Sequence, residues 1–483
     1  MFDNPRQVLL DRRRFLTSTA SGLGAVALSS LLCREGLAGG SAASGAAGPL
    51  SATHHVPRAR RVIHVFSPGG VSHVDTFDYR PELNRMDGRK LTGKGQLDPF
   101  FGRPGVLRKS FFPFRQYGES GTWVSDLFPH LATCVDDLTF FHAVVTKSSS
   151  HTPACFQMNT GFTQAGYPGL GSWLSYGLGT MNEELPTFVV LPDHRGLPNG
   201  GTNNWTNGFL PARHQGTAFS TKQNTSPVPN LATPESVSPR ARSQALETLA
   251  GFNRNFARRH PGDDELAARI AAYELAARMQ TSIPEAVDFR TETRETQQLY
   301  GMDDERTAGF ARNCLLARRL IERGVQFVQL YNGGALGSPR INWDAHEDLV
   351  RNHNNQGILL DRPLAGLLQD LKRRGMLEDT LVLWTSEFGR TPFTQGEGGL
   401  GRDHHPLCFT VWMAGAGLKP GLHYGQSDEV GYQPAENATT VYDLHATILH
   451  LLGIDHERLT YYHNGIDRRL TDVHGHVIQD VLA

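Results

Sequence analysis

Cysteine is scarce in this sequence, with 5 residues among 483, whereas histidine is frequent, with 21. The cysteines are widely spaced, so their positions predict no particular disulfide pairing. A metal site built from thiolates, such as a zinc finger, is therefore not expected. If the protein holds a metal, we expect its ligands to be imidazoles and carboxylates.

An excess of charge of either sign is also missing. Lys and Arg together number 47 against 48 for Asp and Glu, which gives a formal net charge of -1. The sequence has no block of basic residues that would bind a nucleic acid or an anionic membrane surface. We therefore do not expect a nucleic acid as a partner.

A long apolar run is the third missing feature. The short apolar stretch 23–32 contains Gly and Ser and is too short to span a bilayer comfortably. It follows three arginines at 12–14, and this order is typical of a twin-arginine export signal. We interpret residues 1–40 as this signal and residues 41–60 as a linker, with a membrane anchor as the less favoured alternative. This interpretation predicts export to the periplasm or the extracellular space by the twin-arginine machinery, and no stable membrane insertion after processing.

Short runs of β-branched and aromatic residues recur after residue 60, with helical patterns between them. The expected strands are 61–67, 138–144, 187–191, 325–331, 380–386 and 409–415. Apolar residues at helical spacing predict helices over 263–280 and 306–323. This alternation predicts an α/β fold with a doubly wound, mainly parallel sheet that is flanked by helices. We expect residues 61–483 to form one domain, with long loops over 82–125 and 194–240 on one rim.

Polar residues follow the expected strands at several places. In doubly wound sheets, ligands bind beyond the carboxyl ends of the strands. One Asp or His in such a loop is more often a hydrogen-bonded residue than a ligand, but several at the same edge favour a divalent metal site. We predict a site for Zn, Mn or Ca. Its candidate ligands are Asp75, Asp344, His346, Glu387, His404 and His405.

A helix is expected to begin after the strand 138–144, within the stretch KSSSHTPACFQMNTG. Ser150 or a neighbouring serine can cap this helix, and Pro153 suits its first turn. The free N–H groups of such a turn can bind an anion. Residues 149–152 then contain a candidate nucleophile or transition-state donor. A helix cap without chemistry is the alternative.

Several stretches resemble the exported family described as domain of unknown function 1501, and together they cover nearly the whole mature chain. The stretches are PGGVSHVDTFDYRPEL, GLGSWLSYGLG, FARNCLLARRLIERGVQFVQLY, WDAHEDL, SEFGRTP, GRDHHP and DLHATILHLLG. The order of elements is also similar to that of the alkaline phosphatase and sulfatase superfamily. That resemblance implies an alkaline-phosphatase-like fold with divalent metal ions at the carboxyl edge of the sheet.

The superfamily resemblance also implies positions for individual residues. Its paired Asp and His ligands correspond to Asp344 and His346, and its last metal-binding His to His404 or His405. Its nucleophile corresponds to His151 or Ser150. Its Asp-His pair corresponds to Glu387 and Phe388, and its first-strand Asp to a position near Pro68, for which His73 and Asp75 are the nearest substitutes. The Cys-x-Pro-x-Arg signature of the formylglycine sulfatases is absent.

The sequence therefore favours an exported metal-dependent hydrolase that acts on a phosphate, sulfate or related anionic ester, either a small molecule or a polysaccharide. We expect Arg390 and Arg402 to add positive charge in the transition state. His73 or His151 would transfer a proton, or Ser150 would act as the nucleophile. The alternative is a catalytically degenerate binding protein for an anionic polymer such as a sulfated polysaccharide. A third possibility is that the GRDHHP stretch is only structural.

Overall fold

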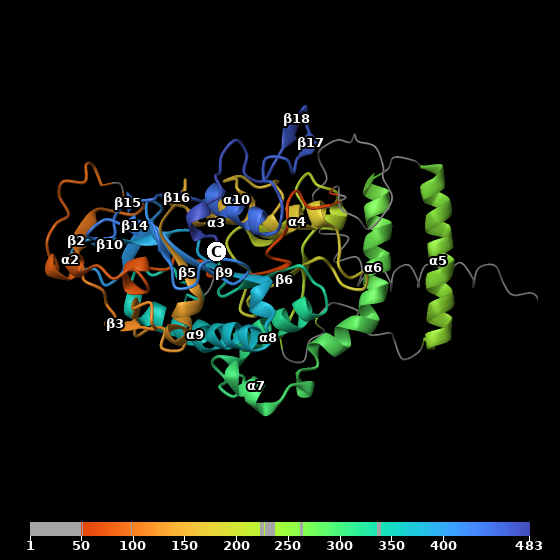
Figure 1. Ribbon diagram of the computed structural model, residues 1–483, viewed down its shortest axis with the longest axis horizontal. Coiled ribbons are helices and arrows are strands. Elements are labelled where there is room, and N and C mark those ends of the chain that lie inside the picture. Colours follow the sequence, from red (N-terminus) through yellow and green to blue (C-terminus); the bar gives the residue numbers. More distant parts are fainter. Residues whose placement is uncertain are drawn as a thin grey trace, which may run out of the picture.

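The computed structural model describes residues 50, 52–97, 99–222, 227, 237–260, 264–335 and 340–483. The predicted export signal and half of the predicted linker, residues 41–49 and 51, lie outside the described residues. The described chain folds around one large central sheet with helices on both of its faces (Figure 1).

The central sheet contains nine strands, most of which are parallel to their neighbours. The strand order is β13-β5-β12-β9-β1-β8-β6-β7, and β16 pairs with β5. The strands are β1 (Arg61–Phe66), β5 (Leu138–Val145), β6 (Phe188–Leu191), β7 (Thr217–Ala218), β8 (Phe327–Tyr331), β9 (Thr380–Thr385), β12 (Phe409–Ala414), β13 (His423–Tyr424) and β16 (Thr439–Thr440). All six predicted strands are present, and the mainly parallel α/β fold is confirmed.

One strand of this sheet runs in the opposite direction, and this reversal matters for the site. β12 is antiparallel to both β5 and β9, whereas β1 is parallel to β8 and β9. The amino end of β12 therefore lies at the same edge as the carboxyl ends of β1, β5, β8 and β9. Residues that precede β12 thus reach the edge at which residues that follow the other strands lie.

The helices divide between the two faces of the sheet (Figure 1). One face carries α3 (His151–Thr160), α4 (Leu170–Leu178) and α10 (Val441–Leu451), and the other carries α8 (Ala308–Glu322) and α9 (Leu349–Arg373). The remaining helices are α2 (Pro81–Arg85), α5 (Pro239–Arg259), α6 (Asp264–Val287) and α7 (Arg294–Leu299). Both predicted helices are present, as α6 and α8. In the described residues, no helix is both long enough and apolar enough to cross a membrane.

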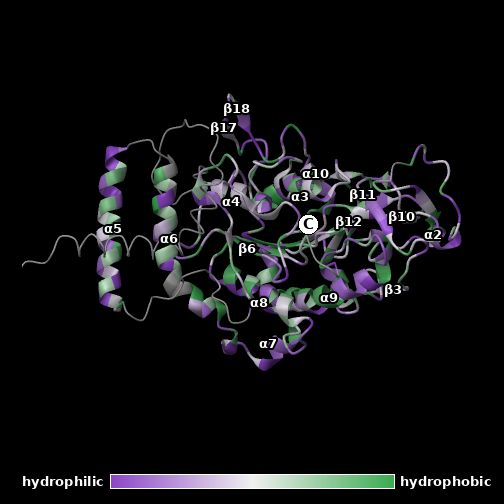
Figure 2. Cartoon of the chain, turned by 180° about the vertical axis from the view of Figure 1, so that it is seen from behind, coloured by the Kyte–Doolittle hydropathy of each residue, from purple (hydrophilic) through white to green (hydrophobic). Residues whose placement is uncertain are grey.

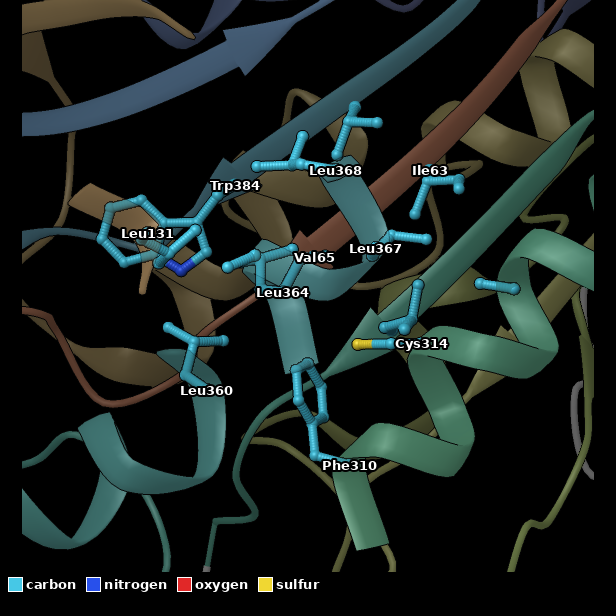
Figure 3. Close-up of a cluster of buried hydrophobic side chains, with 14 of the residues drawn as sticks. Ile63, Val65, Leu131, Phe310, Cys314, Leu360, Leu364, Leu367, Leu368 and Trp384 are labelled. Atoms are coloured by element: carbon cyan, nitrogen blue, oxygen red, sulfur yellow. The ribbon is translucent and has the colours of Figure 1, made fainter. Parts of the chain in front are cut away.

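The core lies between the sheet and its helices. On the α8 and α9 face, apolar side chains of both helices pack against β1 and β9 (Figure 3). Examples are Phe310 and Cys314 of α8, which the helical pattern predicts to point inward, and both are buried. Burial of this apolar surface holds the helices on the sheet and fixes the strand ends that carry the site.

A second, smaller sheet lies beside the central sheet. It has the order β11-β10-β2, with β11 (Arg402–His405), β10 (Gly389–Gln395) and β2 (Pro104–Leu107). The GRDHHP stretch is therefore mostly a strand, paired antiparallel with β10. In Figure 2, the strands at the centre of the molecule are mainly hydrophobic, whereas a hydrophilic strand of the second sheet lies at the labels β10 and β11.

The segments expected to be long loops contain several short elements. Besides α2 and β2, the first contains β3 (Phe114–Tyr117) and β4 (Thr122–Ser125), which form a hairpin. The second contains β7 and two short 3-10 helices. The remaining short strands are β14 (Gln426–Ser427), β15 (Pro434–Glu436), β17 (Tyr461–His463) and β18 (Ile466–Arg468).

Candidate metal centre

Four side chains that could bind a metal meet at one edge of the central sheet. They are His151, Asp344, His346 and His404, and their ligand atoms all lie within 4.8 Å of one another. Asp344 and His346 lie between β8 and α9, and His151 is the first residue of α3, which follows β5. His404 lies in β11, which precedes β12. The direction of each strand thus brings residues from distant parts of the chain to the same edge.

The three imidazoles direct the same nitrogen toward one carboxylate oxygen. The Nε2 atoms of His346, His404 and His151 lie 2.8, 3.3 and 3.4 Å from Oδ1 of Asp344. The Nε2 atoms of His346 and His404 lie 2.9 Å apart. Ligands about 2.0–2.1 Å from a tetrahedral metal would be roughly 3.3 Å from one another. The observed separations are therefore close to those of a metal coordination shell.

The other ring nitrogen of each imidazole is held by a hydrogen bond. Each Nδ1–H donates to an oxygen acceptor behind the cluster. The acceptors are Glu387 Oε1 for His151 (2.6 Å), Gln395 Oε1 for His346 (2.5 Å) and the Ser149 carbonyl for His404 (2.6 Å). With the proton on Nδ1, each Nε2 keeps its lone pair facing the centre. Metal-binding histidines are oriented in this way by partners outside the coordination shell.

Two further observations fit a metal at this point. His151 Nε2 is buried but has no hydrogen-bond partner, which is costly unless another ligand satisfies it. Burial, followed by the charge of Arg390, lowers the pKa of His346 to about 4 and lowers the pKa of His404 even further. Both rings are therefore neutral near pH 7, as metal binding requires. A donor set of imidazole nitrogens and a carboxylate suits Zn or Mn better than Ca, which prefers oxygen.

Two arginines bind the Asp344 carboxylate, one of them buried and the other at the cavity. Arg390 is fully buried, and its Nη2 donates to Asp344 Oδ1 at 2.7 Å. Its other donors bond the carbonyls of Gly69, Gly70 and Arg402, so its guanidinium does not face the cavity. Arg340 instead lies at the cavity, with its side chain 40% exposed, and pairs with Asp344 Oδ2.

Arg402 and Asp75 lie outside the cluster and bind each other. Arg402 Nε donates to Asp75 Oδ2 at 2.7 Å, and both side chains are completely buried. Asp75 also accepts hydrogen bonds from the Ser72 hydroxyl and the Phe111 amide. Burial opposes ionisation of Asp75, but Arg402 outweighs this effect and holds the pKa of the carboxyl below its usual value. The carboxylate is thus committed to Arg402, and neither residue is placed to contact a metal or substrate at the cluster.

His73 and His405 are also directed away from the cluster. Their Nε2 atoms donate to the carbonyls of Gly431 and Tyr432, and their rings stack with centroids 6.1 Å apart. His405 follows His404 in β11, and consecutive side chains of a strand point to opposite faces. Only one of the two histidines can therefore reach the cluster, and the structure places His404 there.

Glu387 supports His151 from behind. Its Oε1 accepts hydrogen bonds from His151 Nδ1 and from the Gly69 amide at 2.8 Å, and its side chain is completely buried. The neighbouring Phe388 packs its ring against His151 and His404, with centroids 5.0 and 4.7 Å away. These contacts give Glu387 a role in orienting His151.

A cavity of about 230 Å³ opens above the four residues. Besides the cluster itself, its lining residues are Phe100, Phe101, Ser150, Thr152, Asn199 and Arg340. The first turn of α3 thus forms part of the cavity wall, as the sequence predicts. Phe100, Phe101, Asn199 and Arg340 could not be identified from the sequence because they lie in segments without periodicity. The only signal for Arg340 is its position four residues before Asp344.

The sheet and this cluster define an α/β protein with a candidate metal centre at the carboxyl edge of a mainly parallel sheet. Residues 59–482 match the model of the family described as "Protein of unknown function (DUF1501)", and the chain belongs to this family. The predicted family is thus confirmed. No curated protein matches the chain at a significant level.

Several solved structures are similar to this chain. Ps i-CgsB in complex with k-i-k-neocarrahexaose is 11% identical, with 82% of this chain and 72% of that chain covered and a TM-score of 0.36. The C-terminal periplasmic domain of EcEptC from Escherichia coli, in complex with Zn, is 9% identical, with 89% and 90% covered and a TM-score of 0.36. The PsFucS1 sulfatase from Pseudoalteromonas sp. is 11% identical, with 86% and 72% covered and a TM-score of 0.35.

Proposed function

We propose that this protein is an exported metal-dependent hydrolase of a phosphate, sulfate or related anionic ester. The observation that carries the proposal is the convergence of three imidazole Nε2 atoms on Asp344 while each Nδ1 is held from behind. A cluster that only stabilised the fold would not need an open cavity above it. This cluster forms the wall of one.

Asp344, His346 and His404 would hold the metal, with Zn as the best match to the donor set. When bound, the metal would supply a Lewis acid for the oxygen atoms of the ester. Arg390 keeps the Asp344 carboxylate in position and satisfies one of its lone pairs. Gln395 and the Ser149 carbonyl keep the two imidazoles in the tautomer that binds a metal.

His151 would transfer a proton at its Nε2 atom. Its side chain is the most exposed of the three imidazoles, at 14% against 8% for His346 and 2% for His404, and its Nε2 has no hydrogen-bond partner. Glu387 accepts a hydrogen bond from Nδ1–H and stabilises the ring when it is charged, as the carboxylate of a catalytic triad does. This assignment agrees with the prediction from the sequence that His151 or His73 transfers a proton. Ser150 lines the same cavity, and in the alternative mechanism it would act as the nucleophile.

Arg340 and the first turn of α3 would bind the anionic part of the ester. Arg340 is the one basic side chain among the lining residues of this cavity, apart from the histidines. The first turn of α3 lines the same space, and the free N–H groups at the start of a helix favour an anion. Arg340 would thus supply the positive charge that the sequence predicts for Arg390 and Arg402.

A catalytically degenerate binding protein for an anionic polymer is the second candidate. In the part of the chain that the structure describes, the cluster around Asp344 is the one group of metal-binding side chains found. Glu387 orients His151, and Phe388 cannot bind a metal, which leaves no second site beside the first. Binding of a sulfated polysaccharide without turnover by the metal-loaded protein would favour this candidate.

Export rests on the sequence of the N-terminal segment. The arginines at 12–14 and the short apolar stretch that follows them support the twin-arginine route, with residues 61–483 as one domain in the periplasm or outside the cell. Replacement of all three arginines by lysine should keep the precursor inside the cell. Release of the mature protein by that variant would contradict the proposal.

The decisive experiment measures the metal content of the purified mature protein by elemental mass spectrometry. We expect near-stoichiometric Zn or Mn in the wild type and its loss in Asp344→Ala and His404→Ala. The matched control is His405→Ala, because His405 is adjacent in the chain but bonds Tyr432 instead. Circular dichroism would show whether each variant is folded. A folded wild type that stays free of metal under replete conditions would overturn the proposal. If the wild type contains the metal, it should next be tested for hydrolysis of phosphate and sulfate esters with and without a chelator.

A further inference from the structure

Two adjacent aromatic residues form one side of the cavity above the metal cluster. Phe100 and Phe101 are 40% and 46% exposed, although they are large and apolar. They precede β2 in a segment without regular structure. Exposed apolar groups beside a polar site often mark a surface that a ligand covers.

Both rings are held in defined positions. The Phe101 amide donates to Asp403 Oδ2 at 2.7 Å, which fixes the backbone at this point. The Phe100 ring stacks on the His404 ring with centroids 4.8 Å apart and an interplanar angle of 21°. Phe101 meets the His346 ring edge-on at 5.1 Å and the Phe100 ring at 4.5 Å. These are favourable geometries for aromatic pairs, so the rings belong to the site.

The cavity therefore contains two chemically different regions. Arg340 and the first turn of α3 offer charge and N–H donors, whereas Phe100 and Phe101 offer an apolar surface of two rings at an interplanar angle of 82°. The volume of about 230 Å³ is below the roughly 300–1,000 Å³ of pockets for drug-sized ligands. It suits an anionic head and one ring, while any longer part of a substrate would lie outside.

We propose that Phe100 and Phe101 form an aromatic wall that binds the alcohol part of the ester, and that this part carries a six-membered ring with an apolar face. This inference rests on the function proposed above. An aryl group and a sugar ring both present such a face to an aromatic side chain. A methyl or ethyl group is too small to cover the two rings, so esters of small alcohols would gain little from the wall.

Equilibrium binding tests this inference without turnover. Isothermal titration calorimetry would compare methylphosphonate, phenylphosphonate and the phosphonate analogue of glucose 6-phosphate, with the wild type as purified. We expect at least one ring-bearing compound to bind about fivefold or more tightly than methylphosphonate, in line with the energy of one aromatic contact. The compound that shows the preference identifies the ring as aryl or sugar.

The variants are Phe100→Ala, Phe101→Ala and the double replacement, with Phe252→Ala as the control. Phe252 is 59% exposed on α5 and does not line the cavity. In the double variant we expect the ratio of the affinity for the ring-bearing compound to the affinity for methylphosphonate to fall to about one. The affinity for methylphosphonate itself and the metal content should not change. The control should keep the full preference.

Equal affinities for all three compounds in the wild type would overturn the inference, as would a preference that survives the double replacement. Failure of all three compounds to bind would overturn it as well. In that case the metal content shows whether the proposed function fails as well. If the protein contains metal but binds no phosphonate, the metal centre stands and only the aromatic wall is contradicted. If the protein contains no metal, both proposals are contradicted.

Discussion

Glu387 accepts a hydrogen bond from Nδ1 of His151 at 2.6 Å, and both side chains are more than four-fifths buried. The pair joins the strand β9, after which Glu387 lies, to the first turn of α3. Because Nδ1 is held, the ring can turn only its Nε2 toward the cavity. The pair thus fixes which nitrogen of His151 faces a substrate.

Replacement of Glu387 by Gln should lower activity while metal binding persists. The amide is similar in size but cannot stabilise a charged imidazole, and partners of this kind typically matter by about 10–100-fold. We expect kcat to fall by that factor and its pH dependence to shift, with metal content unchanged. Loss of the metal in this variant would instead make Glu387 a ligand.

Addition of Zn should stabilise the folded protein by an amount that rises with the logarithm of the Zn concentration relative to its Kd. A ligand that binds only the folded state at a hundredfold excess over its Kd adds about 2.7 kcal/mol to the free energy of unfolding. We expect urea unfolding of the wild type and of His405→Ala to shift by this amount. His346→Ala should show no shift, and an equal shift in that variant would place the Zn elsewhere.

Loss of Arg402 should damage the fold and leave the reaction chemistry intact. Arg402→Met leaves the Asp75 carboxylate buried and unpaired, which typically costs about 3–5 kcal/mol. The double variant with Asp75→Asn should regain part of that free energy, as urea unfolding would show. Folded Arg402→Met should keep its metal. A large loss of kcat without loss of stability would assign Arg402 to the transition state.

Arg340→Ala should weaken the binding of anions. Its guanidinium lines the cavity, and a hydrogen bond to a charged group contributes about 1.5–3 kcal/mol, so the affinity for methylphosphonate should fall about tenfold or more. Arg351→Ala is the control, because Arg351 is exposed on α9 and does not line the cavity. Equal effects of both variants would indicate a general change in surface charge.

The metal-free protein should lose stability as the pH falls below about 6.5. His64 lies in the core on β1, where its Nε2 donates to the Thr385 hydroxyl, and burial lowers its pKa from 6.5 to about 3. The unfolded chain therefore takes up this proton first, and stability is lost between pH 6.5 and 3. Each such histidine contributes about 1.4 kcal/mol per pH unit in that window. Urea unfolding at pH 7 and pH 5 should show a smaller difference for His64→Gln than for the wild type.

Much of the fold could be predicted from continuous apolar runs, because a strand that is buried on both faces of the sheet needs apolar side chains at consecutive positions. The site could be predicted in part, since Asp344, His346 and His151 lie in segments that follow strands of the central sheet and His404 lies shortly before β12. The roles of Arg390 and Arg402 could not, because a sequence does not show whether a guanidinium is already bonded to carbonyls and carboxylates inside the protein. The choice between His404 and His405 likewise depends on which face of β11 meets the cluster.

The four residues of the cluster come from both halves of the chain, with His404 in β11 of the second sheet and the other three after strands of the central sheet. Short-range contacts cannot bring them together, so a coordination shell can be complete only after β11 has docked against the central sheet. A metal would therefore be acquired late in folding and would join the two sheets. If the chain crosses the membrane already folded, the ion that it carries is chosen from the metals of the compartment of synthesis.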